Sequence, residues 1–197
     1  MKEFALVGTP RTEYGKKAAK ALRKEELVPC NLYGCGKNVT FTVKKEDVRK
    51  LIYTPDTMVV DLTIGKQACK AVVKELQFHP ITENVLHIDF LEVNEKKPVT
   101  VEIPVTLTGH AAGVKAGGKL SLELRKLKVN GIYTNIPERV VIDITELELG
   151  KKLAISEVKV ENCKLMNPQD ACVAQVKVTR ASASTEETEE AAAPAAE

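Results

Sequence analysis

Alternation of apolar and polar side chains is the feature that most constrains how this chain folds. In VTVEIPVTLTG, residues 99–109, Val99, Val101 and Ile103 fall on one side of an extended chain, and polar residues separate them. This two-residue period is typical of β-strands with one buried face. Because similar stretches recur through most of the 197 residues, we predict a mainly β protein.

The first half of the chain carries five such patterns with only two short helical segments between them. The predicted strands are KEFALVG (2–8), VTFTV (39–43), MVVDLTI (58–64), CKAVVKELQF (69–78) and VLHIDFLEV (85–93). The helical segments are KKEDVRKLIY (44–53) and a basic stretch that begins near residue 16. This density of strands predicts a small antiparallel β-barrel, with a sandwich as the alternative.

A polar segment that ends in proline, NEKKP (94–98), marks the predicted boundary between two domains. We therefore predict a β-barrel domain at residues 1–94 and a second β-rich domain at residues 95–180. The strands of the second domain are predicted at 99–109, 120–129, 139–145 and 171–179. Residues 181–197 have no large apolar side chain, so they are predicted to form a disordered acidic tail.

The net charge of +2 hides a strong separation of charge along the chain. Residues 11–24 contain six basic residues and one acidic residue, whereas residues 181–197 contain five glutamates and no basic residue. Residues 96–180 carry 14 basic and nine acidic residues. This sorting predicts a surface that binds a polyanion. The acidic tail either serves solubility or competes for that surface, and the sequence leaves both readings open.

The basic residues between positions 16 and 24 share one side of a predicted helix. At about 100° per residue they fall within an arc of about 120°. This face comprises Lys16, Lys17, Lys20, Arg23 and Lys24. Ala18, Ala21 and Leu22 lie opposite, so the helix is predicted to rest on a sheet and to end near residues 25–26. A solvated basic face is the usual explanation, but an exposed Tyr33 predicted in the following PCNLYG favours RNA.

Several classes of protein are disfavoured by what the sequence lacks. No apolar run approaches the roughly 20 residues of a membrane span, and MKEFALVGTP lacks the apolar stretch of a secretory signal. Glu3 and Glu13 disfavour a mitochondrial presequence, which is poor in acidic residues. We therefore expect a cytoplasmic protein that has no contact with membranes.

The cysteines and glycines do not build a metal or nucleotide site. The five cysteines are irregularly spaced and no histidine lies near CNLYGC, which predicts reduced core residues rather than a zinc site. GVKAGGKL (113–120) approaches a phosphate-binding P-loop, but Leu120 stands where a hydroxyl is needed and a strand pattern follows. A glycine-rich hairpin or loop is predicted there, without nucleotide hydrolysis.

His87 and Asp89 lie two residues apart on a predicted strand, so both project from the same face. Such a pair can hold a metal, act as an acid–base couple, present a donor and an acceptor to a ligand, or form a structural hydrogen bond. Further metal ligands and a nucleophile are not marked in the sequence. The residues alone favour the structural hydrogen bond, and no enzyme, cofactor or small-molecule substrate is expected.

The order of several short motifs resembles a known family. Arg11 to Lys16 has the form R-x-x-x-G-K, and the motifs V-P-x-x-L-Y-G (28–34), K-x-x-Q-x-H-P (74–80) and L-H-I-D-F (86–90) follow. In this order they are similar to the bacterial large-subunit ribosomal protein that binds 5S ribosomal RNA. This family is the twenty-fifth protein of that subunit, also known as the Ctc general stress protein family. KPVTVEIPV, GVKAGGKL and IPERVVIDI resemble its longer, two-domain form.

The resemblance implies a β-barrel that grips an internal loop of 5S RNA, followed by a β-rich domain. It implies contacts to phosphates or a groove from the segment of the basic helix, and contacts from one face of the barrel. The residues predicted to bind RNA are Arg11, Gly15, Lys16, Lys17, Lys20 and Arg23 in the first group and Tyr33, Lys74, His87 and Asp89 in the second. Two positions depart from the pattern of the family. Lys20-Ala21 stands in place of consecutive arginines, so the planar guanidinium groups that can bind a phosphate through two hydrogen bonds are missing. Phe78 stands where arginine is frequent.

The function predicted from these residues is that of a structural ribosomal protein, with 5S ribosomal RNA and other large-subunit components as partners. The alternative is a stress-response or protein-interaction module that acts away from the ribosome. The two differ in whether the protein sediments with large subunits.

Overall fold

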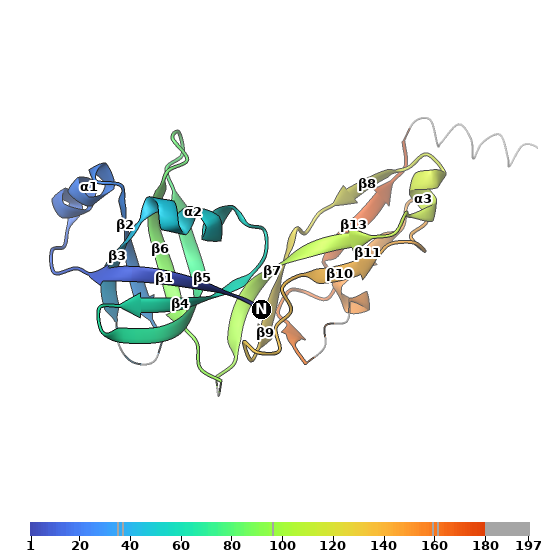
Figure 1. Cartoon of the computed structure of the whole chain (residues 1–197). Coiled ribbons are helices and arrows are strands. Elements are labelled where there is room, and N and C mark those ends of the chain that lie inside the picture. The colour runs from blue at the N-terminus through green and yellow to red at the C-terminus, as the bar shows by residue number, and fades with distance from the viewer. Residues whose placement is uncertain (35, 37, 96, 159, 161, 180–197) are drawn as a thin grey trace, which may run out of the picture. The chain divides into compact units, whose positions relative to one another are not determined.

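The computed structural model describes residues 1–34, 36, 38–95, 97–158, 160 and 162–179 (Figure 1). Two compact units are present, the first made of residues 1–103, 129–138 and 162–164, and the second made of the remaining segments. Strand β7 (Val99–Thr108) supplies residues to both units. The domain boundary at residues 94 and 95 therefore stays a prediction, and the predicted acidic tail, residues 181–197, lies outside the described residues.

The first unit contains a closed barrel of six strands in the order β1-β3-β2-β6-β5-β4. The strands are β1 (Lys2–Pro10), β2 (Leu27–Tyr33), β3 (Val39–Lys44), β4 (Met58–Ile64), β5 (Gln67–Phe78) and β6 (Val85–Glu92). Five of them coincide closely with the alternating segments of the sequence, but β2 was not among the predicted strands. The mainly β class and the small barrel are thus confirmed.

Two seams of the barrel are parallel, so the barrel is mixed rather than wholly antiparallel. β1 pairs with β4 in parallel, and β2 pairs with β6 in parallel. Antiparallel neighbours can be joined by a tight turn, whereas parallel neighbours need a long connection. Both parallel pairs meet this condition, because several other elements separate their members along the chain. Periodicity alone predicts a strand but not its direction.

Aromatic and aliphatic side chains fill the barrel and leave its outer face to polar residues. The Phe41 and Phe90 rings are fully buried, and their centroids are 5.7 Å apart. Gly8 lies against Phe41, where an added Cβ would stand 2.5 Å from the ring. Cys30 is also fully buried, as predicted, and burial strongly raises the pKa of its thiol.

Two helices accompany the barrel, α1 (Lys16–Lys24) and α2 (Lys45–Tyr53). α2 buries Val48 and Leu51 against the barrel core. α1 ends at Lys24 with Glu25 as its C-cap, close to the predicted end near residues 25–26. It rests on the barrel less closely than α2, since none of its nine residues, all described, is fully buried. Ala18 and Leu22 lie on the half-buried side of α1. Ala21 is exposed, so the prediction that Ala21 lies against the sheet was wrong.

The C-terminal half is also β-rich. Its further strands are β8 (Lys119–Leu122), β9 (Lys126–Gly131), β10 (Val140–Asp143), β11 (Lys152–Ala154), β12 (Lys164–Leu165) and β13 (Cys172–Lys177). They form a four-stranded sheet, β10-β7-β9-β12, and a three-stranded sheet, β11-β13-β8. The single strand predicted at 120–129 is in fact two, β8 and β9, with a bend between them.

The glycine-rich segment before β8 contains a short helix, α3 (Ala112–Lys115), which the sequence did not predict. Gly113 packs so closely that an added Cβ would lie 2.5 Å from the backbone nitrogen of Leu149. After this helix a turn leads into β8 at Lys119, so a strand follows the lysine, as predicted.

Among the described residues, the helices are all too short or too polar to cross a membrane.

Candidate nucleic-acid interface

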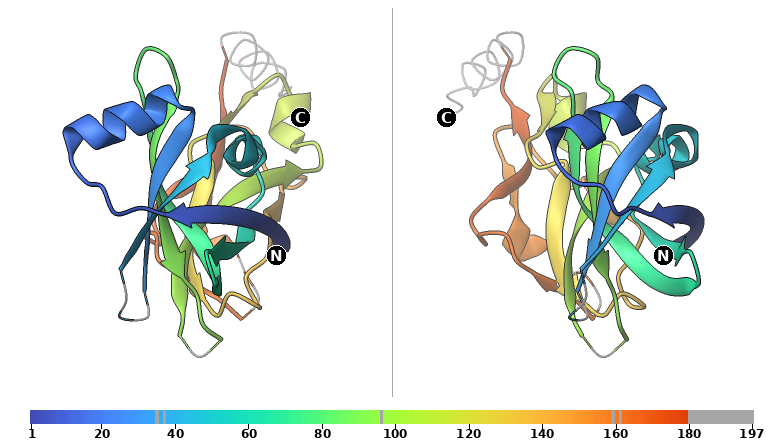
Figure 2. Two further views of the ribbon diagram at one scale, coloured as in Figure 1. Left: turned by 60° about the vertical axis from the view of Figure 1, so that its left-hand side comes forward. Right: turned by 90° about the vertical axis from the view of Figure 1, so that its left-hand side faces the viewer.

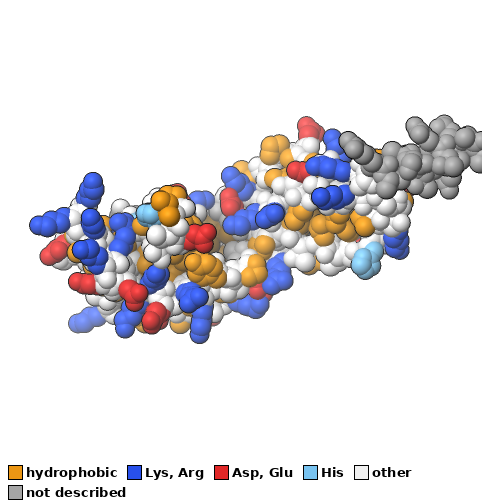
Figure 3. Space-filling model, turned by 90° about the horizontal axis from the view of Figure 1, so that it is seen from above, with side chains coloured by type: hydrophobic (Ala, Val, Ile, Leu, Met, Phe, Trp, Pro, Cys, Tyr) orange, Lys and Arg blue, Asp and Glu red, His pale blue; other side chains and the backbone are white. Residues whose placement is uncertain are grey.

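The basic side of α1 is fully open to solvent. Lys16, Lys17, Lys20, Arg23 and Lys24 are all exposed, and Lys and Arg side chains gather over this end of the first unit in Figure 3. Lys16 and Lys17 occupy the first turn, where the helix dipole disfavours positive charge. These two charges therefore do little for the stability of the helix, whereas Arg23 and Lys24 in the last turn suit the dipole, and all five suit the binding of a polyanion.

Gly15 opens α1 in a conformation that favours glycine. Its φ is 100° and its ψ is 176°, and its carbonyl accepts a 3.0 Å hydrogen bond from the Ala19 amide. An added Cβ would meet no described atom within 4 Å, so the backbone angle and not crowding requires glycine here. The open space agrees with the prediction that a phosphate approaches this backbone.

Arg23 joins α1 to the barrel. Its Nε donates a 3.1 Å hydrogen bond to the carbonyl oxygen of Leu86 on β6. Figure 2 shows α1 lying across the barrel beside the loop that joins β5 and β6. A guanidinium group has five N–H donors, so Arg23 can hold the helix in place and still donate to a phosphate.

The outer face of β2 and β6 carries the predicted barrel contacts. Asn31 on β2 is the cross-strand partner of Asp89 on β6. Tyr33 and His87 project from the same face, because residues between these four positions point into the core. On the other side of β6, Asp89 is the partner of Glu75 on β5. The structure thus brings Tyr33, His87 and Asp89 together, as predicted.

His87 and Asp89 lie in contact but do not form the predicted hydrogen bond. Nδ1 of His87 is 3.2 Å from Oδ1 of Asp89, yet this oxygen has no hydrogen-bond partner among the described residues, so the contact lacks the alignment of a hydrogen bond. Burial lowers the pKa of His87, and Asp89 opposes this effect. The neutral imidazole offers one donor and one acceptor nitrogen to a ligand.

Three buried polar atoms near this face lack hydrogen-bond partners within the described part of the chain: Arg11 Nε, Asn31 Oδ1 and Asp89 Oδ1. Arg11 and Asp89 both lie close enough to shift the pKa values of Cys30 and His87, so they belong to one neighbourhood. An unsatisfied buried polar group costs about 1–3 kcal/mol.

Tyr33 and Lys74 differ in how well they fit the predicted site. Tyr33 is 36% exposed at the end of β2, and burial, then Asp89 and Glu75, raise the pKa of its hydroxyl, which keeps it protonated as a donor. Lys74 lies at a β-bulge, and its Nζ donates a 3.3 Å hydrogen bond to the carbonyl of Thr100. The structure therefore directs Lys74 towards β7, apart from the other predicted contacts.

The sequence interpretation missed three residues of this region, Tyr14, Asn31 and Glu75. Asn31 was detectable as a polar residue inside the otherwise apolar VPCNLY strand. Tyr14 was detectable as an aromatic residue immediately before the Gly-Lys of the basic helix. Glu75 could not be placed from the sequence, because the β-bulge at Lys74 determines the face of β5 on which Glu75 lies.

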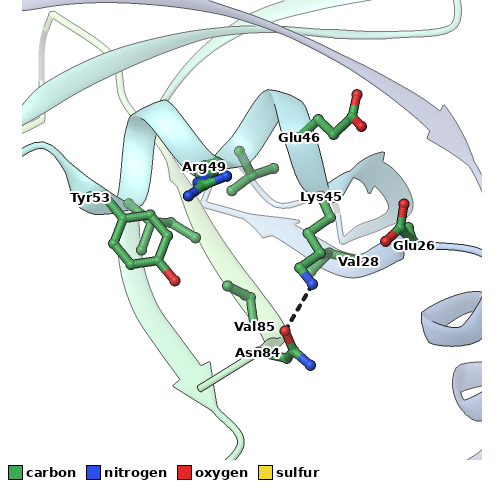
Figure 4. A pocket seen from close by; sticks show the side chains of 10 residues that line it. Glu26, Val28, Lys45, Glu46, Arg49, Tyr53, Asn84 and Val85 are labelled. Carbon is green, nitrogen blue, oxygen red and sulfur yellow. Dashed lines mark hydrogen bonds between the residues drawn. The ribbon is translucent and has the colours of Figure 1, made fainter. Parts of the chain in front are cut away.

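A hollow of about 400 Å³ lies beside α2, between this helix and the first residues of β6 (Figure 4). Lys45 reaches across its rim and donates a 2.8 Å hydrogen bond from Nζ to Oδ1 of Asn84. Its charged lining is mixed, since Glu26 and Glu46 line it together with Lys45 and Arg49. This hollow therefore has no preference for a polyanion and is not part of the basic surface.

Comparisons with known proteins match both halves of the chain. The Ribosomal L25p family model matches residues 6–90, and that of the C-terminal domain of ribosomal protein TL5 matches residues 98–180. Large ribosomal subunit protein bL25 of Porphyromonas gingivalis is 55% identical over 183 residues, which cover 92% of this chain and 95% of that protein. The bL25 proteins of Azobacteroides pseudotrichonymphae and Bacteroides thetaiotaomicron are 50% and 46% identical, over 94% and 92% of this chain and 98% and 95% of theirs.

Proposed function

The chain belongs to the Ribosomal L25p family, and from this membership we propose that it is a structural protein of the large ribosomal subunit that binds 5S ribosomal RNA. Its role is structural rather than enzymatic, as is that of its family. In this proposal RNA occupies the basic side of α1 and the adjacent outer face of β2 and β6.

The observation that carries the proposal is that a hydrogen bond holds α1 beside the outer face of β2 and β6, which carries polar side chains. The bond from Arg23 to Leu86 ties the helix to β6, the strand that bears His87 and Asp89. Cations on the helix attract phosphates of any sequence, whereas donors and acceptors on the barrel face can distinguish one RNA from another. The same RNA would thus be bound tightly through α1 and selected through the neighbouring face of the barrel.

Folded RNA suits this face better than a simple polyanion does. The wide, shallow minor groove of RNA presents 2′-hydroxyls and base edges, which can pair with the partly exposed side chains of Tyr33, His87 and Asp89 on the outer face of the barrel. A polyanion that carries only charge would neutralise α1 but make no use of these three side chains. Selectivity for one RNA over another is therefore the property that the proposed role predicts.

The test is to follow the full-length protein through a sucrose gradient of cell lysate and to extract the RNA that copurifies with it. We expect it to sediment with large subunits and, after the subunits are dissociated in high salt, to rebind 5S RNA when the salt is lowered. If the protein stays in the light fractions and captures no RNA, the proposed function is contradicted. The alternative, a stress-response or interaction module acting off the ribosome, would then be favoured.

A further inference from the structure

Tyr14 is an exposed aromatic residue that is held in one orientation next to the proposed RNA surface. It lies between β1 and α1, directly before Gly15, and is 66% exposed. Its hydroxyl donates to the carbonyl of Arg11 at 3.3 Å and accepts from Oγ1 of Thr40 at 3.2 Å. Two hydrogen bonds on an exposed side chain restrict its motion before any ligand arrives.

One side of the Tyr14 ring is covered by a cation. Cζ of Arg11 stands 5.7 Å from the ring centroid, within the range of a cation–π contact. The backbone of Arg11 is itself fixed, because its amide donates a 3.2 Å hydrogen bond to the carbonyl of Thr40. With Arg11 on one side and 66% of the residue exposed, the ring keeps a free surface for a second planar group.

The position of Tyr14 extends the proposed RNA surface. Asp89 pairs with Asn31 across β6 and β2, and Asn31 pairs with Thr40 across β2 and β3. Neighbouring strands lie about 4.8 Å apart, so these three residues form a short row over the outside of the barrel. The bond from Thr40 to the Tyr14 hydroxyl places the ring at the end of this row, and α1 begins two residues later.

We propose that Tyr14 is a stacking platform for an unpaired nucleobase of the bound RNA, with the base on the free face of the ring and Arg11 on the other. This inference rests on the proposed RNA-binding function. Bases in loops and bulges of RNA are splayed out and stack on aromatic side chains, and stacking tolerates any base. Tyr14 therefore adds affinity for RNA with an unpaired base near the phosphates held by α1, and paired helices gain nothing from it.

The experiment is a titration of the full chain and its Tyr14→Phe and Tyr14→Ala variants against 5S RNA. Tyr53→Ala is the matched control, because Tyr53 is 65% exposed on α2. We expect Tyr14→Ala to weaken binding by about 5- to 150-fold, the range measured for loss of one stacked base. Tyr14→Phe, which keeps the ring, should retain most of the affinity, and Tyr53→Ala should match the wild type.

Ultraviolet crosslinking separates stacking from an indirect effect through Arg11. A base stacked on the ring should crosslink to the tryptic peptide of residues 12–16, TEYGK, and the crosslink should persist in Tyr14→Phe. Unchanged affinity in Tyr14→Ala, or weakened affinity with no crosslink in this peptide, would overturn the inference. Loss of Tyr14→Ala from large subunits with unchanged affinity for free RNA would also overturn it and indicate a protein contact.

The outcomes for Tyr14 are distinguishable from those for the proposed function. If the wild-type chain itself fails to bind 5S RNA, the proposed function fails and the Tyr14 inference fails with it. If the wild type binds 5S RNA and the Tyr14 variants bind it equally well, the stacking role alone is overturned.

Discussion

Asn31 and Asp89 are cross-strand partners on the parallel strands β2 and β6, and each keeps a buried side-chain oxygen without a hydrogen-bond partner among the described residues. Two neighbouring acceptors in this state are unfavourable for the free protein. Both lie on the outer face of the barrel, where an RNA could supply donors. The pair therefore marks the part of the candidate site where polar groups from two strands meet.

Replacing Asn31 by valine should separate stability from recognition. Asn31→Val removes one unsatisfied acceptor and introduces a β-branched residue into a strand, so the free energy of unfolding should rise by about 1 kcal/mol. Selectivity for 5S RNA over a control RNA should fall in the same variant. Urea unfolding and RNA titration measure the two quantities, and a loss of stability with unchanged selectivity would show that Asn31 is only structural.

Replacing Asp89 by alanine should impair discrimination more than affinity for RNA in general. A hydrogen bond to a charged group contributes about 1.5 kcal/mol or more, so selectivity should fall by about tenfold. Asp61→Ala is a suitable control, because Asp61 lies on β4 beside Lys70. Competition titrations with several RNAs report the effect. Equal weakening towards all of them would argue against a role of Asp89 in reading RNA.

Charge reversal on α1 should act on all RNAs alike. Lys20→Glu should weaken binding strongly and should reduce the slope of log K against log salt by about 0.7–0.9, since one phosphate contact is lost. Lys50→Glu is the control, because Lys50 is an exposed lysine on α2. The measurement is a salt series of binding isotherms. An unchanged slope in Lys20→Glu would remove Lys20 from the interface.

Arg23 has a second role that a variant can isolate. Arg23→Lys keeps the positive charge but lacks the Nε that donates to Leu86, so it should loosen α1 from the barrel. We expect faster amide hydrogen exchange in residues 16–24 and weaker RNA binding, with little change in the salt slope. Wild-type exchange in this helix together with wild-type affinity would contradict the anchoring role.

His87 should make the stability of the barrel depend on pH. Because its pKa in the folded protein is lowered below 6.5, the unfolded chain takes up a proton at higher pH than the folded one. Its contribution to the free energy of unfolding is thus complete above pH 6.5 and is lost as the pH falls below that value. Subtracting the pH profile of His87→Gln from that of the wild type isolates the effect, and a difference that stays flat from pH 7 to 5 would contradict it.

Most strands of the barrel were predictable because each buries one face, and such burial leaves a period of two. β2 was missed, because Val28, Pro29 and Cys30 are buried in succession and break this period. MVVDLTI was predicted at residues 58–64 and forms β4 over the same residues. Strands β11 and β12, of three and two residues, are too short to show any period. The parallel seams were not predictable either, because the direction of a strand is set by the path of the chain between partners.

The candidate site was predictable where neighbours in sequence are neighbours in space. His87 and Asp89 share a strand, and the cations of α1 share a helix, so spacing placed them correctly. Asn31 depends on pairing between β2 and β6, which are far apart in the sequence. Lys74 was misleading because a bulge turns its side chain towards Thr100, and a bulge leaves no periodic signal.

The central claim is that this chain recognises 5S RNA rather than RNA in general. The most direct measurement is a titration of the full-length protein against 5S RNA and a control RNA of equal length, at low and at physiological salt. We predict tight binding that prefers 5S RNA, with a preference that remains when added salt weakens both complexes. Equal affinities for the two RNAs at both salt concentrations would contradict the account.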